Sequence, residues 1–185
     1  MNETIRIIEE RFSCRSFTDE VITDEQLKTI AKAANHSPSA RNIQPWRIIV
    51  LKDKSLMDEL ETEGLNMMKA MLDKSLYERI QSRGGKLFYN AQSMIFIPIN
   101  KTESDYALMD CGIVCENVAI AAKSLGVDSC ICGLAGIPFA GENSAHYKAK
   151  LGFPEGFEFG IAILLGHAVE PVAPHEQDDA KISFI

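Results

Sequence analysis

Apolar residues recur every three to four positions over several stretches of the chain, and this period predicts amphipathic helices. One of them starts at Thr23-Asp-Glu-Gln26, a capping-box sequence in which the threonine and the glutamine satisfy each other's backbone N–H groups. The longest is rich in alanine and ends at Gly126, so we expect it to lie close against a neighbouring element. The predicted helices cover residues 3–12, 23–36, 54–88, 105–125 and 141–151.

Runs of apolar and β-branched residues lie between these helices and predict strands. Residues 93–99 and 157–165 are almost entirely apolar, which is typical of strands buried on both faces of a sheet, and we expect the second to be central. The predicted strands cover residues 46–51, 93–99, 127–134 and 157–165. Helices and strands that alternate without internal repeats predict a single α/β or α+β domain over residues 1–185.

Two segments stand apart from this pattern. Residues 54–90 are charged and rich in methionine, and Arg83-Gly-Gly85 interrupts them, so we expect a variable helical insert that can close as a lid. Residues 168–185 contain two prolines and end in the apolar patch Ile182-Ser-Phe-Ile185. That patch is too small to fold alone, and we expect this C-terminal arm to pack across a subunit boundary.

The composition narrows the class of protein. A net charge of −7 argues against binding to nucleic acid or to a membrane surface, and no apolar run is long enough to span a bilayer. The N-terminus has no apolar signal segment, so we expect a cytoplasmic protein. The five cysteines form no CxxC pair and the histidines no ligand-spaced pair, which favours buried reduced thiols over a metal site.

One loop carries an unusual set of side chains. Ser37-Pro-Ser-Ala-Arg-Asn-Ile-Gln-Pro-Trp46 combines two prolines, two amides, two serines and the only tryptophan of the chain. Polar groups on a stiff backbone fix the orientation of a planar ligand, so this loop is a candidate binding element. The alternative is purely structural: Pro38 ends a helix and Pro45 starts a strand.

A second candidate segment follows the first predicted helix. Arg11, Ser13 and Arg15 alternate, so in extended backbone their side chains point to one side, where two guanidinium groups and a hydroxyl suit a phosphate. The alternative is a solvated pair of surface arginines. The chain has no GxGxxG, Walker A, GxSxG or HExxH motif and no acid–base pair of carboxylates, which favours chemistry supplied by a cofactor.

Together these segments resemble the FMN-dependent nitroreductase family. Residues 11–17 are similar to its RxSxRxF opening, and residues 37–46 to its PSxxNxQPW loop. Residues 110–126 are similar to its D-x-G…N…A-A…L-G helix, and the likeness continues through Cys130-Ile-Cys-Gly133 and Leu165-Gly-His167. The resemblance touches nearly the whole chain and is weakest over residues 54–90 and the last fifteen residues.

The resemblance implies an α+β fold of three layers, a central, mostly antiparallel sheet flanked by helices. It also implies an interlocked homodimer with two FMN sites at its interface. Arg11, Phe12 and Ser13 would surround the FMN phosphate, and Arg15 would reach the ribityl chain or the N1/O2 edge. The other implied contacts are Pro38, Ser39, Ala40, Asn42 and Gln44 from the second subunit, and the backbone N–H groups of Cys132 and Gly133 at flavin N5 and O4.

The implied activity is the reduction of nitroaromatic or quinone-type acceptors by NADH or NADPH, by ping-pong hydride transfer through flavin N5 without a catalytic side chain. The alternative is a flavin-binding redox sensor, or a flavoprotein of low turnover, in which Cys14 or Cys132 responds to oxidants.

The chain departs from the family pattern after the last predicted strand. The family usually places a lysine or arginine there, whereas residues 173–179 offer only His175 among acidic residues. One lost charge-assisted bond costs about 1.5–3 kcal/mol, so we expect FMN to be held roughly ten- to a hundredfold less tightly. The family's flavin-pyrimidine asparagine has no clear counterpart either.

Overall fold

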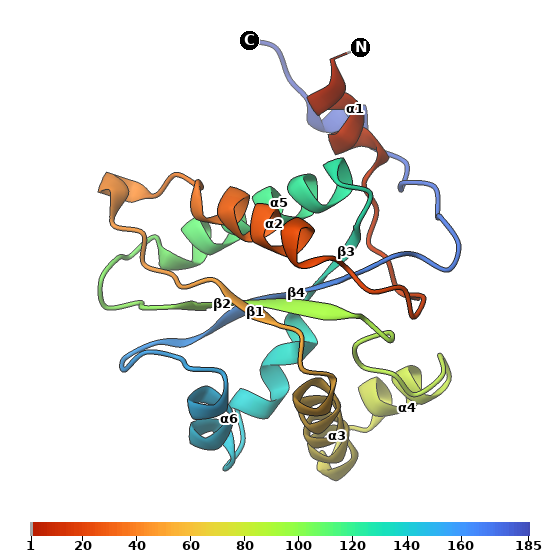
Figure 1. Ribbon diagram of the computed structural model, residues 1–185, viewed down its shortest axis with the longest axis vertical. Helices are drawn as coiled ribbons and strands as arrows, with labels where there is room; N and C mark the ends of the chain where they lie inside the picture. The colour runs from red at the N-terminus through yellow and green to blue at the C-terminus, as the bar shows by residue number, and fades with distance from the viewer. Residues whose placement is uncertain (1) are drawn as a thin grey trace.

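Six α-helices and four β-strands make up the computed structural model, which describes residues 2–185 (Figure 1). The helices are α1 (Glu3–Glu10), α2 (Asp24–Asn35), α3 (Lys54–Ala70), α4 (Ser75–Gln81), α5 (Ala107–Ser124) and α6 (Ser144–Lys150). The strands are β1 (Ile49–Leu51), β2 (Ser93–Ile99), β3 (Asp128–Cys132) and β4 (Glu158–Gly166). Three 3₁₀ segments complete the set: η1 (Ala40–Asn42), η2 (Gly133–Phe139) and η3 (Asp179–Lys181).

The strands form one sheet in the order β1-β2-β4-β3, and every pair is antiparallel. Ile95 of β2 lies opposite Ile163 of β4, and Cys130 of β3 lies opposite Leu164. β4 is therefore an interior strand, as its apolar sequence predicted. The predicted α+β class with a mostly antiparallel sheet is confirmed.

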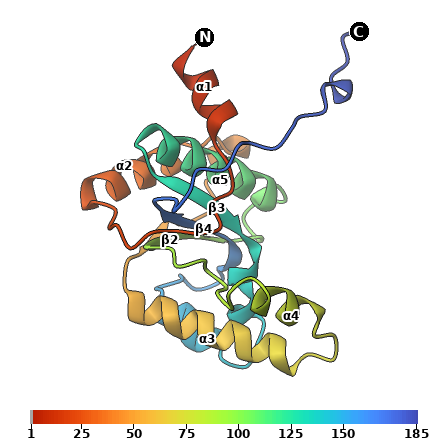
Figure 2. The ribbon, with the colours of Figure 1, turned by 90° about the vertical axis from the view of Figure 1, so that its right-hand side faces the viewer.

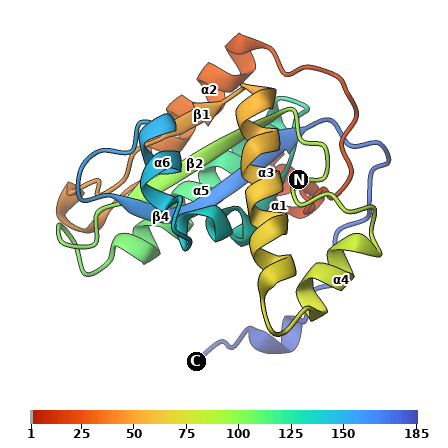
Figure 3. The ribbon, with the colours of Figure 1, turned by 90° about the horizontal axis from the view of Figure 1, so that it is seen from below.

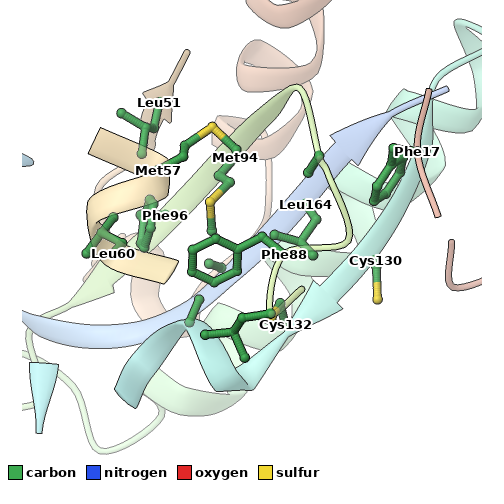
Figure 4. Packing of buried hydrophobic residues seen from close by; sticks show 14 of the residues in the cluster. Phe17, Leu51, Met57, Leu60, Phe88, Met94, Phe96, Cys130, Cys132 and Leu164 are labelled. Atoms are coloured by element: carbon green, nitrogen blue, oxygen red, sulfur yellow. The ribbon is translucent and has the colours of Figure 1, made fainter. Parts of the chain in front are cut away.

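Helices cover both faces of this sheet, which gives three layers (Figures 1 and 3). Because neighbouring residues of a strand point to opposite faces, β2 supplies both cores. Ile95, Ile97 and Ile99 belong to the core beneath α2 and α5, whereas Met94 and Phe96 pack toward α3 on the other face (Figure 4). A strand buried on both faces favours apolar residues, which explains why β2 is apolar at every position after Ser93.

Local sequence signals set several element boundaries. The Thr23 side chain accepts the Gln26 N–H group, and Gln26 Oε1 accepts the Thr23 N–H at 3.0 Å, so the predicted capping box is present. Gly126 follows α5 with φ of +74°, a left-handed conformation that glycine adopts without strain. Both boundaries were predicted from the sequence alone.

Three predicted elements differ from the structure. Residues 54–88 contain two separate helices, α3 and α4, joined by a turn in which Asp73 accepts the Ser75 N–H group, and residues 82–88 are not helical. The predicted strand 46–51 is paired continuously only over β1. Trp46 makes an isolated bridge to Ile99 in the same register, and Pro98, which lies between that bridge and the paired residues, has no N–H group to donate. The predicted strand 127–134 ends at Cys132, where η2 begins. The role of residues 54–90 as a lid stays a prediction.

Glu61 fastens the segment after α4 to α3. Its side chain lies almost fully inside the protein, where Oε1 accepts the Phe88 N–H group at 2.8 Å and Oε2 lies 3.5 Å from Lys86 Nζ. We expect Glu61→Ala to lower the free energy of unfolding by about 2–3 kcal/mol, because it leaves a buried N–H group unpaired. Glu61→Gln, which keeps an acceptor, should cost less than about 1 kcal/mol.

Chemical denaturation measures both changes. Glu59→Ala is the matched control on the same helix, because Glu59 pairs with Lys150 at the surface and should change stability by less than about 0.5 kcal/mol. Equal losses for Glu59→Ala and Glu61→Ala would contradict a special role for Glu61.

The C-terminal arm, residues 168–185, leaves the sheet and extends away from the body of the molecule (Figures 1 and 2). Phe184 and Ile185 are fully exposed, Ile182 is 61% exposed, and Ile5 and Ile8 of α1 are half-exposed. None of the helices within residues 2–185 combines the length and hydropathy needed to cross a bilayer.

Candidate functional site

Residues 11–17 run along the outer edge of the sheet, beside β3. Ser13 forms a parallel bridge with Ser129, and the Cys14 N–H group donates to the Ser129 carbonyl at 2.9 Å. Phe17 then bridges Ala168, just past β4. The segment is therefore extended where the alternation of its polar side chains required it.

The start of this segment is tied to α5. Arg11 Nε donates to Glu116 Oε1 at 3.0 Å, and both side chains remain more than one-third exposed. Lys123 Nζ lies 5.1 Å from the centre of the Phe12 ring and 3.3 Å from Asp128 Oδ1. A guanidinium group has five donors, so the bond to Glu116 leaves Arg11 with donors for an anion.

Arg15 lies farther along the same edge, exposed to solvent. Burial raises the pKa of the Cys130 thiol and the pKa of the Tyr89 hydroxyl, and the positive charge of Arg15 opposes both rises. The positive charge of Arg83 also lowers the pKa of Tyr89, whereas the neighbouring Cys132 raises it. Arg15 is therefore a solvent-facing cation beside a buried polar cluster.

The end of β3 offers open backbone next to this cluster. Cys132 is buried, but Gly133 is exposed, and a Cβ atom built on Gly133 would meet only Ile161 Cδ1, at 3.9 Å. The Cys132–Gly133 peptide is thus approachable by a flat group, in the way that a glycine next to a ligand allows. The structure brings Arg15 and Gly133 to the same edge of the sheet.

The loop from Ser37 to Trp46 lies elsewhere, between α2 and β1. Arg41, Asn42 and Gln44 all have left-handed backbone, with φ of 54°, 55° and 53°. The Ser39 hydroxyl accepts the Gln44 N–H group at 2.9 Å, and Gln44 Nε2 donates to Asn42 Oδ1 at 2.8 Å. It is uncommon for several non-glycine residues of one loop to have left-handed backbone, and this conformation points to a functional constraint.

The two predicted halves of the site lie along different parts of α5. The Ala40 N–H group donates to Asp110, in the first turn of α5, whereas Phe12 lies under Lys123, in the last turn. The thirteen-residue spacing between Asp110 and Lys123 corresponds to about 20 Å along a helix. In one chain the loop therefore contacts the end of α5 opposite to the end that lies over Phe12.

Comparison with known proteins assigns the fold to a family. The family model described as Nitroreductase family matches residues 8–167. The chain belongs to the nitroreductase family. A solved nitroreductase of Desulfitobacterium hafniense with bound FMN is 49% identical, with a TM-score of 0.97 over 100% of this chain and 99% of that one.

Two further relatives extend the comparison. A nitroreductase of Bacteroides fragilis, also solved with bound FMN, is 25% identical, with a TM-score of 0.89 over 100% of both chains. A candidate NADH dehydrogenase/NAD(P)H nitroreductase of Archaeoglobus fulgidus is 30% identical over 97% of this chain and 93% of its own length. Membership of the nitroreductase family makes this protein an NAD(P)H-dependent oxidoreductase, as its sequence motifs implied.

Several features of this nitroreductase-family site were not predicted from the sequence. Tyr89 and Arg83 lie near Arg15, although the sequence around them shows no motif. Glu116 pairs with Arg11 across 105 positions of sequence, which no local pattern signals. His175, the one predicted cation after the last strand, is exposed on the arm, and its ring makes no hydrogen bond or ion pair within residues 2–185.

All five cysteines are buried and none forms a disulfide within residues 2–185, so the predicted burial is confirmed; their reduced state stays a prediction. Burial raises the pKa of Cys14 and raises that of Cys132 to about 11, so at pH 8 only about a thousandth of Cys132 is thiolate. We expect the native protein to react slowly with a colorimetric disulfide reagent, and five thiols per chain to react at once in denaturant.

The pH dependence has a definite sign. The native reaction should accelerate as pH rises toward the raised pKa values, because the thiolate is the reacting species. Rapid native reaction of one thiol per chain at pH 7 would contradict this picture and favour the redox-sensor alternative through Cys14 or Cys132.

Proposed function

We propose that this protein is an FMN-dependent NAD(P)H:acceptor oxidoreductase that works as a homodimer. The observation that carries the proposal is the β3 edge of the sheet, where Arg15 faces solvent near Cys130 and where the backbone at Gly133 is open. When bound, FMN supplies the hydride chemistry, accepting a hydride from NADH or NADPH and passing electrons to a nitroaromatic or quinone-type acceptor.

Each residue of this edge has a defined task. Arg11, with donors left over from its bond to Glu116, and Ser13 hold the phosphate. Arg15 places its charge at the N1/O2 edge of the flavin, where reduction adds negative charge, and so favours the reduced state. The Cys132 and Gly133 N–H groups orient the ring. Because no side chain supplies the chemistry, donor and acceptor use the same slot in turn, in a ping-pong sequence.

A second copy of the chain completes the site. The loop with Pro38, Ser39, Ala40, Asn42 and Gln44 contacts α5 about 20 Å along the helix from Phe12, at the proposed phosphate end, and in the proposed homodimer the second subunit contributes this loop. Apolar side chains on α5 support such an interface, because Leu108 and Met109 are more than 60% exposed. The arm carries further exposed apolar side chains that a second subunit can cover: Ile182, Phe184 and Ile185.

A direct experiment tests the proposal. Purified protein is scanned for flavin absorbance, loaded with FMN, and titrated without oxygen, first with NADH and then with NADPH. We expect flavin absorbance that either nucleotide bleaches and that menadione restores, together with loss of bound FMN in Arg11→Ala. Because residues 173–179 provide only His175 as a cation, part of the protein should purify without flavin. Colourless protein that ignores added FMN and NADH would overturn the proposal.

A further inference from the structure

Two side chains of α5 form hydrogen bonds with the loop between α2 and β1. Asn117 Nδ2 donates to the Ser37 hydroxyl at 2.8 Å, and that hydroxyl donates to the Ala34 carbonyl at 2.7 Å. Asp110 Oδ1 accepts the Ala40 N–H group at 3.4 Å. Asp110 and Asn117 are separated by seven residues, or two helical turns, so they lie on one face of α5.

Residues 37–46 include backbone conformations that are unfavourable for residues other than glycine. Arg41, Asn42 and Gln44 are left-handed, and such backbone persists only where surrounding contacts impose it. Within the loop, the bond from the Gln44 N–H group to the Ser39 hydroxyl closes the turn. The contacts that impose the conformation from outside include the two from α5.

Asp110 has unused capacity to bind. Its side chain is almost fully buried, with 3% of the residue exposed, and Oδ2 has no hydrogen-bond partner within residues 2–185. Its bond to Ala40 is also long for a carboxylate, which normally accepts several short bonds when buried. The carboxylate can therefore accept a second backbone N–H group from the loop beside it.

We propose that Asp110 and Asn117 are positioning residues that hold the loop in the geometry at which it meets the flavin of the second subunit. When FMN binds, the loop moves closer to α5, and a second backbone N–H group of the loop then donates to Asp110. The inference rests on the proposed function, because it concerns the loop of that same site. Neither residue touches the flavin; both act through the loop.

Hydrogen exchange of residues 37–46 in FMN-free protein tests whether Asp110 and Asn117 hold the loop, and it requires no catalysis. We expect Asp110→Ala and Asn117→Ala each to raise the exchange rate of these amides by roughly tenfold or more, because each removes a contact that opposes local opening. Asp110→Asn keeps one acceptor oxygen and should lie between wild type and Asp110→Ala. Adding FMN should slow exchange in wild type by a larger factor than in Asp110→Ala.

The matched control is Ser124→Ala on the same helix, whose hydroxyl bonds only to the Ala121 carbonyl. It should leave the exchange of residues 37–46 unchanged. In steady-state assays, Asp110→Ala should raise the acceptor KM by roughly tenfold or more while kcat stays within about twofold, a split that general loss of stability would not produce.

The outcomes separate cleanly. Unchanged loop exchange in both Asp110→Ala and Asn117→Ala, or equal exchange in Ser124→Ala, overturns the inference. If Asp110→Ala does not fold, Asp110→Asn and Asn117→Ala decide the same question. If the wild-type protein binds no flavin, the proposed function fails. The exchange rates measured without FMN still test whether Asp110 and Asn117 hold the loop.

Discussion

Replacing Arg15 with alanine will lower kcat/KM for NAD(P)H oxidation by roughly 100- to 1000-fold, the range measured when one preorganised donor is removed from developing negative charge. Arg15 is a solvent-facing cation near Cys130, on the β3 edge that ends at the open backbone of Gly133. Without it, the negative charge that reduction adds to the flavin is less stabilised. The flavin midpoint potential should fall in the same variant.

Anaerobic stopped-flow reduction measures the rate, and a dye-coupled titration measures the potential. Arg15→Lys keeps the charge but loses the forked donors, so we expect an intermediate rate. Arg79→Ala is the matched control, because Arg79 is an exposed arginine on α4. Both predictions would be wrong if Arg15→Ala stayed within threefold of wild type at an unchanged potential.

The sequence predicted those parts of the fold that depend on local chemistry. Thr23 and Gln26 form a capping box in which each side chain accepts the other residue's N–H group, three positions away, and Gly126 follows α5 where the backbone turns left-handed. The largely apolar β2 and β4 were recognisable for the same reason, because burial on both faces favours apolar residues at nearly every position. Such signals need no knowledge of distant contacts.

The parts that were not predicted depend on contacts between distant residues. Trp46 joins the sheet by an isolated bridge to Ile99, beyond Pro98, which cannot donate an N–H group to the pairing with β1. Tyr89 lies beside Arg15 because its carbonyl accepts the Phe17 N–H group across 72 positions of sequence. Local periodicity carries no information about such pairings.

The candidate site shows the same division. The resemblance found Arg15 and Gly133, and the structure brings them to one edge, although their roles stay predictions. The left-handed backbone of Arg41 and Gln44 has no sequence signal, because left-handed turns are usually marked by glycine. The buried, half-satisfied Asp110 belongs to the family's helix motif, yet only its environment shows what it contacts.

In the proposed homodimer, deleting residues 182–185 will weaken association of the two subunits by roughly 100- to 1000-fold. The deletion removes Ile182, Phe184 and Ile185, which are exposed on an arm that extends from the body of the chain (Figure 2). Burying such a side chain contributes about 1.5–3 kcal/mol, part of which is offset by ordering the arm. Three of them therefore account for roughly two to three powers of ten in the dissociation constant.

Sedimentation velocity over a dilution series measures this dissociation constant. Leu72→Ala is the control, because Leu72 is also fully exposed but lies at the junction of α3 and α4, at the opposite end of the molecule from the arm (Figure 1). Since the loop of one subunit is proposed to cover the flavin of the other, the shortened protein should also lose FMN as it is diluted. An unchanged dimer after the deletion would show that the arm packs against its own chain, and the exposed faces of α1 and α5 would then have to hold the subunits together unaided.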